Sequence, residues 1–206
     1  AFYLASTLES TWACRLIGET TNQLCEGEIR QKGNQGDFGL SEEGYLQIND
    51  AKTASLCSCA CRLGVPENPH QEGLSEQVAS FGRYLGQAFQ IADDILDFTG
   101  DAATLGKPVG HDLREGKITL PLIRALAAAE TGERESIVTL LRTQDAGESD
   151  RQQILEFVHR HDGVAAASAT AHDYAAEALK CLEVVEPSVA RSILETAVRL
   201  VVERDS

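Results

Sequence analysis

The sequence predicts an all-α protein that folds as a single domain. Apolar residues recur at helical spacing nearly everywhere, and no segment alternates between apolar and polar residues as a half-buried strand would. A chain of 206 residues can bury one sizeable core without needing a second domain, and its hydrophobic share of 43% is ordinary for a globular protein. No apolar run approaches the roughly 20 residues that span a bilayer, so we expect no transmembrane segment.

The breaks between the expected helices carry suitable chemistry. The glycine-rich loop at 33–41 ends at Ser41, a favourable helix N-cap, and the segment 64–73 combines glycine and proline. Pro121 falls in the first turn of its helix, where a missing N–H is harmless. The expected helices cover residues 2–31, 42–63, 73–98, 118–130, 133–142, 150–160, 163–184 and 188–203.

The net charge argues against a nucleic-acid partner, and the spacing of the cysteines argues against a zinc site. A net charge of −14 argues against a nucleic-acid partner, because phosphate backbones are bound by clustered Lys and Arg. A phosphorylated substrate stays open, since a bound divalent metal can invert the local field. In the stretch CSCAC, a helix separates Cys57 and Cys61 by one turn and directs Cys59 elsewhere, which argues against a zinc site. We expect free, mostly buried thiols in a cytoplasmic protein.

One expected helix carries an unusual polar stripe within the segment GQAFQIADDILDFTG. At about 100° per residue, Asp93, Asp94 and Asp97 fall on one narrow face, and we call these three residues the acid row. Gln90 and Gly86 share that face. The opposite side carries the apolar residues Leu85, Ala88, Phe89, Ala92, Ile95 and Leu96.

The acid row suits magnesium bound to a phosphorylated ligand. Without a cation, the adjacent charges of Asp93 and Asp94 would repel each other and weaken the helix. Mg²⁺ prefers oxygen ligands and usually binds through one or two carboxylates plus substrate phosphates. The long glycine-rich loop that follows supplies Lys107 and Lys117. A solvated polar face is the alternative, but the exclusive use of Asp, the amide of Gln90 and the two lysines favour a site.

Three stretches of the sequence resemble one family. The segment GQAFQIADDILDFTGDAATLGKPVGHDLREGKITLPL resembles the second aspartate-rich region of the trans-prenyl diphosphate synthases, which make farnesyl, geranylgeranyl and longer polyprenyl diphosphates. EGEIRQ (26–31) resembles the family's Gly-Glu helix, and YLQINDAKTASLCSCACRLG (45–64) resembles its Lys-Thr helix. The resemblance extends to the terminal VVERDS and implies an isoprenoid synthase fold, a helical bundle around a central cavity. It also implies a homodimer.

The sequence departs from the family pattern at its beginning. The family carries a first DDxxD motif on an earlier helix, whereas the only Asp-Asp pair here is that of the acid row. We therefore interpret residues 1–206 as one helical domain that lacks the helices bearing the first motif. The sequence also has no Met and opens within a helical pattern, so we expect the natural chain to begin before Ala1.

The resemblance implies magnesium-dependent chemistry. Family members use three Mg²⁺ ions, held between the two aspartate motifs, to ionise an allylic prenyl diphosphate. The double bond of isopentenyl diphosphate then attacks in a head-to-tail 1′-4 condensation, and a proton is lost. Carried onto this sequence, Asp93 and Asp97 would be metal ligands, and Asp94 would assist directly or through metal-bound water. Asp112 would bind metal-associated water.

The same resemblance assigns roles to residues outside the acid row. Lys52 and Lys107 would bind the allylic diphosphate and neutralise the leaving group, and Lys117 would do the same at the mouth of the site. Thr53 and Gln90 would direct oxygen dipoles toward the developing cation, a form of stabilisation that preorganised polar groups supply well.

Two alternatives belong to other functional classes. A terpene cyclase of the same architecture would ionise a diphosphate without isopentenyl diphosphate, but its second motif is usually an Asn/Ser/Glu triad. A non-catalytic subunit of a heteromeric synthase would explain the absent first motif. Retention of the acid row, Gln90, Lys52 and Thr53 weighs against that subunit, because a redundant site has no physical reason to keep a repulsive stripe.

Overall fold

The described part of the computed structural model is built of helices, which confirms the predicted all-α class. It comprises residues 1–8, 11–65, 72–99, 110–143 and 147–203, and no strand occurs within these ranges. The elements are α1 (Phe2–Ser6), α2 (Trp12–Gly33), α3 (Glu42–Asn49), the π turn η1 (Asp50–Ala54), α4 (Ser55–Leu63), α5 (Glu72–Thr99), α7 (His111–Arg114), α8 (Leu120–Ala128), α9 (Thr131–Leu141), α10 (Glu148–Arg160), α11 (Gly163–Cys181), the 3₁₀ turn η3 (Leu182–Val184) and α12 (Val189–Glu203).

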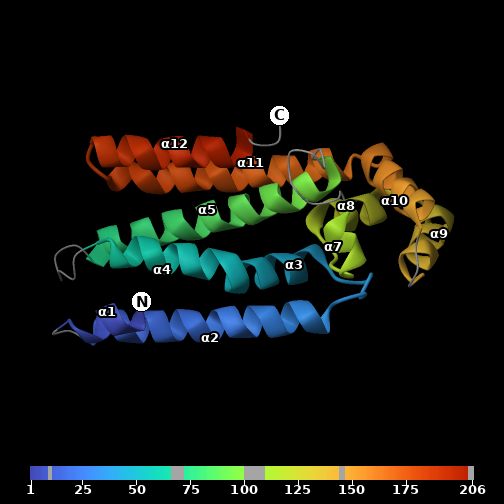
Figure 1. The fold of residues 1–206 in the computed structure, drawn as a ribbon. Coiled ribbons are helices and arrows are strands. Elements are labelled where there is room, and N and C mark those ends of the chain that lie inside the picture. The colour runs from blue at the N-terminus through green and yellow to red at the C-terminus, as the bar shows by residue number, and fades with distance from the viewer. Residues whose placement is uncertain (9–10, 66–71, 100–109, 144–146, 204–206) are drawn as a thin grey trace.

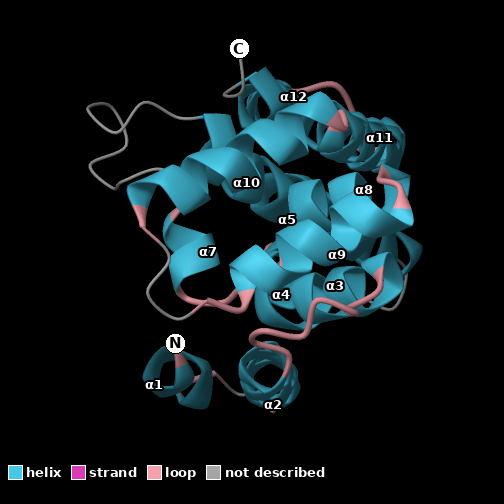
Figure 2. Cartoon of the chain, turned by 90° about the vertical axis from the view of Figure 1, so that its right-hand side faces the viewer, coloured by secondary structure: helices cyan, strands magenta, loops and turns pink. Residues whose placement is uncertain are grey.

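The long helix α5 lies at the centre of the bundle. In Figure 1, α11 and α12 lie on one side of α5, and α4 with α3 lies on the other. The helix α2 forms the outermost layer beyond α4, with the short α1 beside it (Figure 2). The shorter helices α7, α8, α9 and α10 gather at the end of the bundle where α5 ends (Figure 1). None of the described helices has the length and apolar character needed to cross a membrane.

The core is formed largely by the apolar face of α5. One cluster joins Ile91, Ile95 and Phe98 of this helix to buried residues of α8, α10 and α11, and a second cluster surrounds Phe81. Complete burial of a large apolar side chain stabilises a fold by about 1.5–3 kcal/mol. The helix α11 faces these clusters with small residues, which allow close packing: Ala167, Ala171, Ala175 and Ala178.

Several boundaries follow the predicted chemistry. Ser41 caps α3, because its Oγ accepts a hydrogen bond from the Gly44 N–H at 3.1 Å. Pro121 lies in the first turn of α8. The helices predicted over 73–98, 118–130 and 133–142 correspond to α5, α8 and α9 with small shifts at their ends.

Other expectations were wrong. The helix predicted over 2–31 is two helices, α1 and α2, and the helix predicted over 42–63 changes to π geometry at η1. The predicted loop at 100–117 contains the short helix α7, and its residues 100–109 lie outside the described chain. Phe89, which was expected on the apolar side of its helix, is 39% exposed.

The thiols are free but less buried than predicted. All six cysteines are unpaired, yet of these only Cys59 and Cys181 are buried, and Cys25 is exposed. Cys57 and Cys61 lie one turn apart on α4, and burial raises the pKa of both thiols, that of Cys61 to about 11. Protonated thiols of this kind behave as small apolar groups rather than as metal ligands or nucleophiles.

The π turn η1 is held between two helices by glycines. A Cβ atom added to Gly27 of α2 would lie 2.8 Å from the backbone N of Lys52, and one added to Gly86 of α5 would lie 2.6 Å from the Cα of Ala54. Neither separation leaves room for a side chain, so both helices approach η1 backbone to backbone. Single π turns occur frequently at functional sites, so η1 indicates that Lys52 and Thr53 belong to such a site.

We predict that Gly86→Ala destabilises the protein by about 1–3 kcal/mol, because the new methyl group overlaps the backbone of η1. Gly73→Ala is the matched control on the same helix, where nothing lies within 4 Å of the added Cβ. Its effect should be neutral or stabilising by up to about 1 kcal/mol, since Ala favours helices over Gly. Urea unfolding measures both, and equal effects would contradict the proposed close approach.

Candidate active site

The acid row faces a cavity of about 500 Å³ between α2, η1, α5 and the segment that begins with α7. This cavity brings together residues that are far apart in the sequence, including predicted site residues from three separate segments. The polar residues that line it are Gln31, Lys52, Gln90, Asp93, Asp94, Asp97, His111, Asp112, Glu115 and Lys117. Lys107 lies outside the described residues.

Asp94 is the buried member of the acid row. Only 4% of it is exposed, and its two carboxylate oxygens accept hydrogen bonds from the Tyr45 hydroxyl at 2.6 Å and the Gln90 amide at 2.8 Å. Burial raises the pKa of Asp94 to about 7, the two hydrogen bonds oppose this rise, and the charges of Asp112 and Asp93 add to it. The structure therefore turns Asp94 toward α3.

Asp93 and Asp97 present carboxylates to the cavity in different ways. Asp93 is exposed, and it makes no hydrogen bond or ion pair within the described parts of the chain. Asp97 is half-buried and accepts the backbone N–H groups of His111 at 2.9 Å and Asp112 at 3.1 Å, one on each oxygen. Burial and the nearby Asp112 charge raise the pKa of Asp97. Each oxygen keeps a second lone pair, so Asp97 can position α7 and still accept a cation.

Lys52 extends from η1 toward α2. Its Nζ donates a hydrogen bond to Gln31 Oε1 at 2.6 Å and lies 3.1 Å from Glu28 Oε1. These partners hold the ammonium of Lys52, which lines the cavity.

Lys117 also lines the cavity. Its Nζ lies 2.8 Å from an oxygen of Asp112 and 2.7 Å from an oxygen of Glu115. Burial disfavours the charge, but these two carboxylates outweigh it and raise the pKa of the Lys117 ammonium. The lysine therefore stays charged, paired with Asp112 and Glu115.

Thr53 and Gln90 meet across the contact between η1 and α5. The Thr53 hydroxyl donates to Gln90 Oε1 at 2.9 Å, while Gln90 Nε2 donates to Asp94. The donating hydroxyl of Thr53 keeps its oxygen lone pairs for another group. The contact exists because Gly86, one turn before Gln90, lets α5 approach η1 closely.

The donor set fits Mg²⁺ bound together with a ligand, rather than a cage built by the protein alone. Among the described residues, no group of three or more His, Cys, Asp or Glu side chains is arranged to hold a metal ion. Mg²⁺ usually keeps several waters and uses one or two carboxylates plus substrate phosphates. Asp93 and Asp97, one turn apart on a cavity wall that also carries lysines, match that pattern.

Sequence reasoning missed four residues that hold the site. Tyr45, Glu28, Gln31 and His111 all contact predicted site residues. Glu28 and Gln31 lie three residues apart after Gly27, a spacing that places them on one helix face and could have indicated them. Nothing in the sequence pairs Tyr45 with Asp94, because 49 residues separate them.

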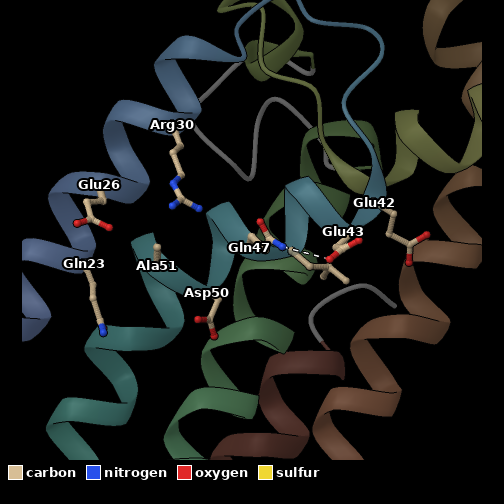
Figure 3. A pocket seen from close by; sticks show the side chains of 9 residues that line it. Gln23, Glu26, Arg30, Glu42, Glu43, Gln47, Asp50 and Ala51 are labelled. Carbon is tan, nitrogen blue, oxygen red and sulfur yellow. Dashed lines mark hydrogen bonds between the residues drawn. The ribbon is translucent and has the colours of Figure 1, made fainter.

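A second cavity, of about 620 Å³, lies between α2, α3 and η1 and contains none of the predicted site residues. Figure 3 shows Arg30 extending from α2 toward α3, with Glu26 on the same helix and Glu43 bonded to Gln47. Four carboxylates and one guanidinium line this cavity, and two of those carboxylates already pair with Arg83 and Arg124. Its charge does not suit a diphosphate.

An all-α bundle in which an aspartate row and two lysines face one cavity is the arrangement expected of a protein that binds metal-complexed diphosphates. The sequence profile of the Polyprenyl synthetase family matches residues 1–158, and the chain belongs to that family. It is 33% identical over 204 residues to a prenyl transferase of Cyanophora paradoxa, covering 99% of this chain and 61% of that protein.

Other similar proteins are named as polyprenyl diphosphate synthases. Octaprenyl diphosphate synthase of Escherichia coli is 32% identical over 211 residues, which cover 100% of this chain and 63% of the relative. Heptaprenyl diphosphate synthase component 2 of Bacillus subtilis is 32% identical, with 93% of this chain and 54% of the relative covered. One similar solved structure is a polyprenyl synthase from Caulobacter crescentus in complex with calcium and isoprenyl diphosphate. It superposes with a TM-score of 0.89 at 33% sequence identity, and the match covers 100% of this chain and 62% of that chain. The chain thus spans about three fifths of the length of these relatives.

We predict that Asp94 makes folding stability depend on pH. Its pKa is about 7 in the folded protein but close to 3.9 in an unfolded chain. Between these values the folded state holds a proton that the unfolded state has released. This contribution to stability is therefore fully present at low pH and is lost as the pH rises through about 7.

Urea unfolding at about pH 5.5 and pH 8, with metal removed by chelation, measures this contribution. From pH 5.5 to 8, the free energy of unfolding should fall by roughly 2 kcal/mol more in the wild type than in Asp94→Asn, whose amide cannot titrate in this range. The comparison uses the change with pH and not the absolute stability, since the amide also alters two hydrogen bonds. Equal pH dependence in the two proteins would contradict the assignment.

Proposed function

We propose that this chain forms part of a prenyltransferase that condenses an allylic prenyl diphosphate with isopentenyl diphosphate to give a longer polyprenyl diphosphate. The observation that carries the proposal is the meeting of the acid row, Lys52 and Lys117 at one cavity, although they come from different segments. Family membership supports it, as do the isoprenyl diphosphate and calcium bound to the Caulobacter crescentus relative.

The carboxylates would bind the metal, and the lysines would bind the diphosphate oxygens. Asp93 and Asp97 would hold Mg²⁺, and Asp94 would support them from its buried position. The metal, when bound, neutralises the developing charge of the leaving diphosphate. Lys52 and Lys117, which both line the cavity, would bind its oxygens. Lys107 is proposed for the same role.

Thr53 and Gln90 act on the allylic carbon rather than on the diphosphate. The Thr53 hydroxyl donates a hydrogen bond to Gln90 Oε1, so the free lone pairs of its oxygen would face the positive charge that develops on the allylic carbon. Oxygen dipoles that are already oriented stabilise such charge without reorganisation during the reaction. Asp112, held by Lys117, is proposed to bind metal-associated water.

We further propose that the complete site needs a first aspartate motif, with three Mg²⁺ ions held between the two motifs, and that the protein functions as a homodimer. Large apolar side chains exposed on α1 and α2 support an interface, notably Tyr3 and Ile29, which are 80% and 71% exposed. The Bacillus subtilis relative is a numbered component, so pairing with a different subunit is the alternative outcome.

We predict that Asp93→Asn in the natural-length protein lowers turnover by about a hundredfold, because loss of one metal ligand removes several kcal/mol of charge stabilisation. The matched control is Asp173→Asn, an exposed aspartate of α11 outside the cavity. Incorporation of labelled isopentenyl diphosphate into extractable product measures turnover, and thermal unfolding confirms that both variants fold. Near-normal turnover of Asp93→Asn would refute the metal assignment.

Incubation of the wild type with allylic diphosphate alone separates the functional classes. A prenyltransferase should leave the substrate largely unchanged until isopentenyl diphosphate is added. Release of a cyclic hydrocarbon from the allylic substrate alone would identify a cyclase. No turnover with either substrate set, together with activity gained on mixing with a second subunit, would identify a component of a heteromeric synthase.

A further inference from the structure

Tyr45 stands behind the acid row and contacts it directly. Its hydroxyl donates to Asp94 Oδ2 at 2.6 Å, and Asn49, one turn later in the chain, donates to the same hydroxyl at 3.4 Å. Tyr45 is only 6% exposed and its ring packs in the core cluster with Ile91 and Ile95. A short hydrogen bond between buried partners, one of them a carboxylate, is among the stronger interactions available to a protein.

The bond from Tyr45 is the first of a directed series. In the structure both carboxylate oxygens of Asp94 accept hydrogen bonds, Oδ2 from Tyr45 and Oδ1 from the NH₂ group of Gln90 at 2.8 Å. The amide oxygen of Gln90 must then point the other way, toward Thr53, and there it accepts the threonine hydroxyl. Reversing the amide would place two acceptors face to face at Asp94.

We propose that Tyr45 is a positioning residue for the reaction, which it influences through Asp94. By holding one carboxylate oxygen, it keeps Asp94 turned toward α3 and keeps the other oxygen on Gln90. Gln90 is thereby fixed in a single amide orientation, and Thr53 is made a donor with its lone pairs directed away from Gln90. This role rests on the proposed function, whereas the orientation itself can be measured without turnover.

A purely structural role for Tyr45 makes different predictions. In that case the hydroxyl would only satisfy a buried carboxylate, and its loss would lower stability without changing Gln90 or the chemical step. The test variant is Tyr45→Phe, which keeps the ring in the core. The matched control is Tyr84→Phe, because Tyr84 is a partly buried tyrosine of α5 whose ring is tilted against that of Tyr174, 6.2 Å between centroids, and it lies outside the cavity.

The first measurement is NMR of protein labelled with ¹⁵N in glutamine side chains. The Gln90 NH₂ resonances, assigned with Gln90→Glu, should be shifted and protected from exchange in the wild type. They should remain so in Tyr84→Phe. In Tyr45→Phe their protection should fall about tenfold, because the Asp94 carboxyl that accepts the Gln90 amide is no longer held in place by the tyrosine hydroxyl. Unchanged Gln90 resonances in Tyr45→Phe would overturn the proposal, whatever the enzyme's activity.

The second measurement is steady-state kinetics of the natural-length protein. Tyr45→Phe should lower kcat by about tenfold and change the KM of the allylic diphosphate by less than about twofold, because the proposed function assigns Gln90 and Thr53 to the developing cation and not to the diphosphate. In an Asp94→Ala background the same substitution should have no further effect on kcat. Additive losses, or a change confined to KM, would contradict action through Asp94.

The two measurements separate this inference from the proposed function. If the wild type fails to condense the two diphosphates, the proposed function fails, and the Gln90 resonances still decide whether Tyr45 orients the amide. If the wild type is active and Tyr84→Phe resembles it, a loss of both Gln90 protection and kcat in Tyr45→Phe supports positioning. Normal kcat in Tyr45→Phe rejects it.

Discussion

The close approach of α5 to the π turn η1 is the contact on which the site depends. At Gly86 the two backbones are so near that an added Cβ would lie 2.6 Å from the Cα of Ala54. One residue before Ala54 stands Thr53, and one turn after Gly86 stands Gln90, so the contact carries these two side chains to within 2.9 Å of each other. Gly27 presses α2 onto the same turn from the other side.

The cavity that results has an uneven distribution of charge. The carboxylates of the acid row come from α5, whereas Lys52 comes from η1 and contacts Glu28 of α2. Burial raises the pKa of Asp94 and Asp97, which indicates that the folded protein tolerates these groups at a cost to their ionised forms. A divalent cation would offset that cost by favouring the ionised carboxylates, and a diphosphate would in turn be held by the cation and the lysines.

Sequence periodicity predicted what local geometry determines and missed what tertiary contacts determine. The acid row could be predicted because a regular helix fixes the angles between Asp93, Asp94 and Asp97. Periodicity cannot reveal which arcs other helices cover, so it placed Phe89 on the buried side although it is partly exposed. The π turn was missed because glycine contacts from two distant helices impose it. The burial of Asp94 was missed because it depends on Tyr45.

Anomalous diffraction from crystals of the protein soaked with Mn²⁺ and inorganic diphosphate tests the central claim most directly. Manganese prefers the same oxygen ligands as magnesium and can be located independently of the diphosphate. We predict a metal peak between the carboxylates of Asp93 and Asp97, with diphosphate oxygens reaching Lys52 and Lys117. Metal bound instead in the carboxylate-rich cavity between α2 and α3, or no metal at the acid row, would contradict the claim.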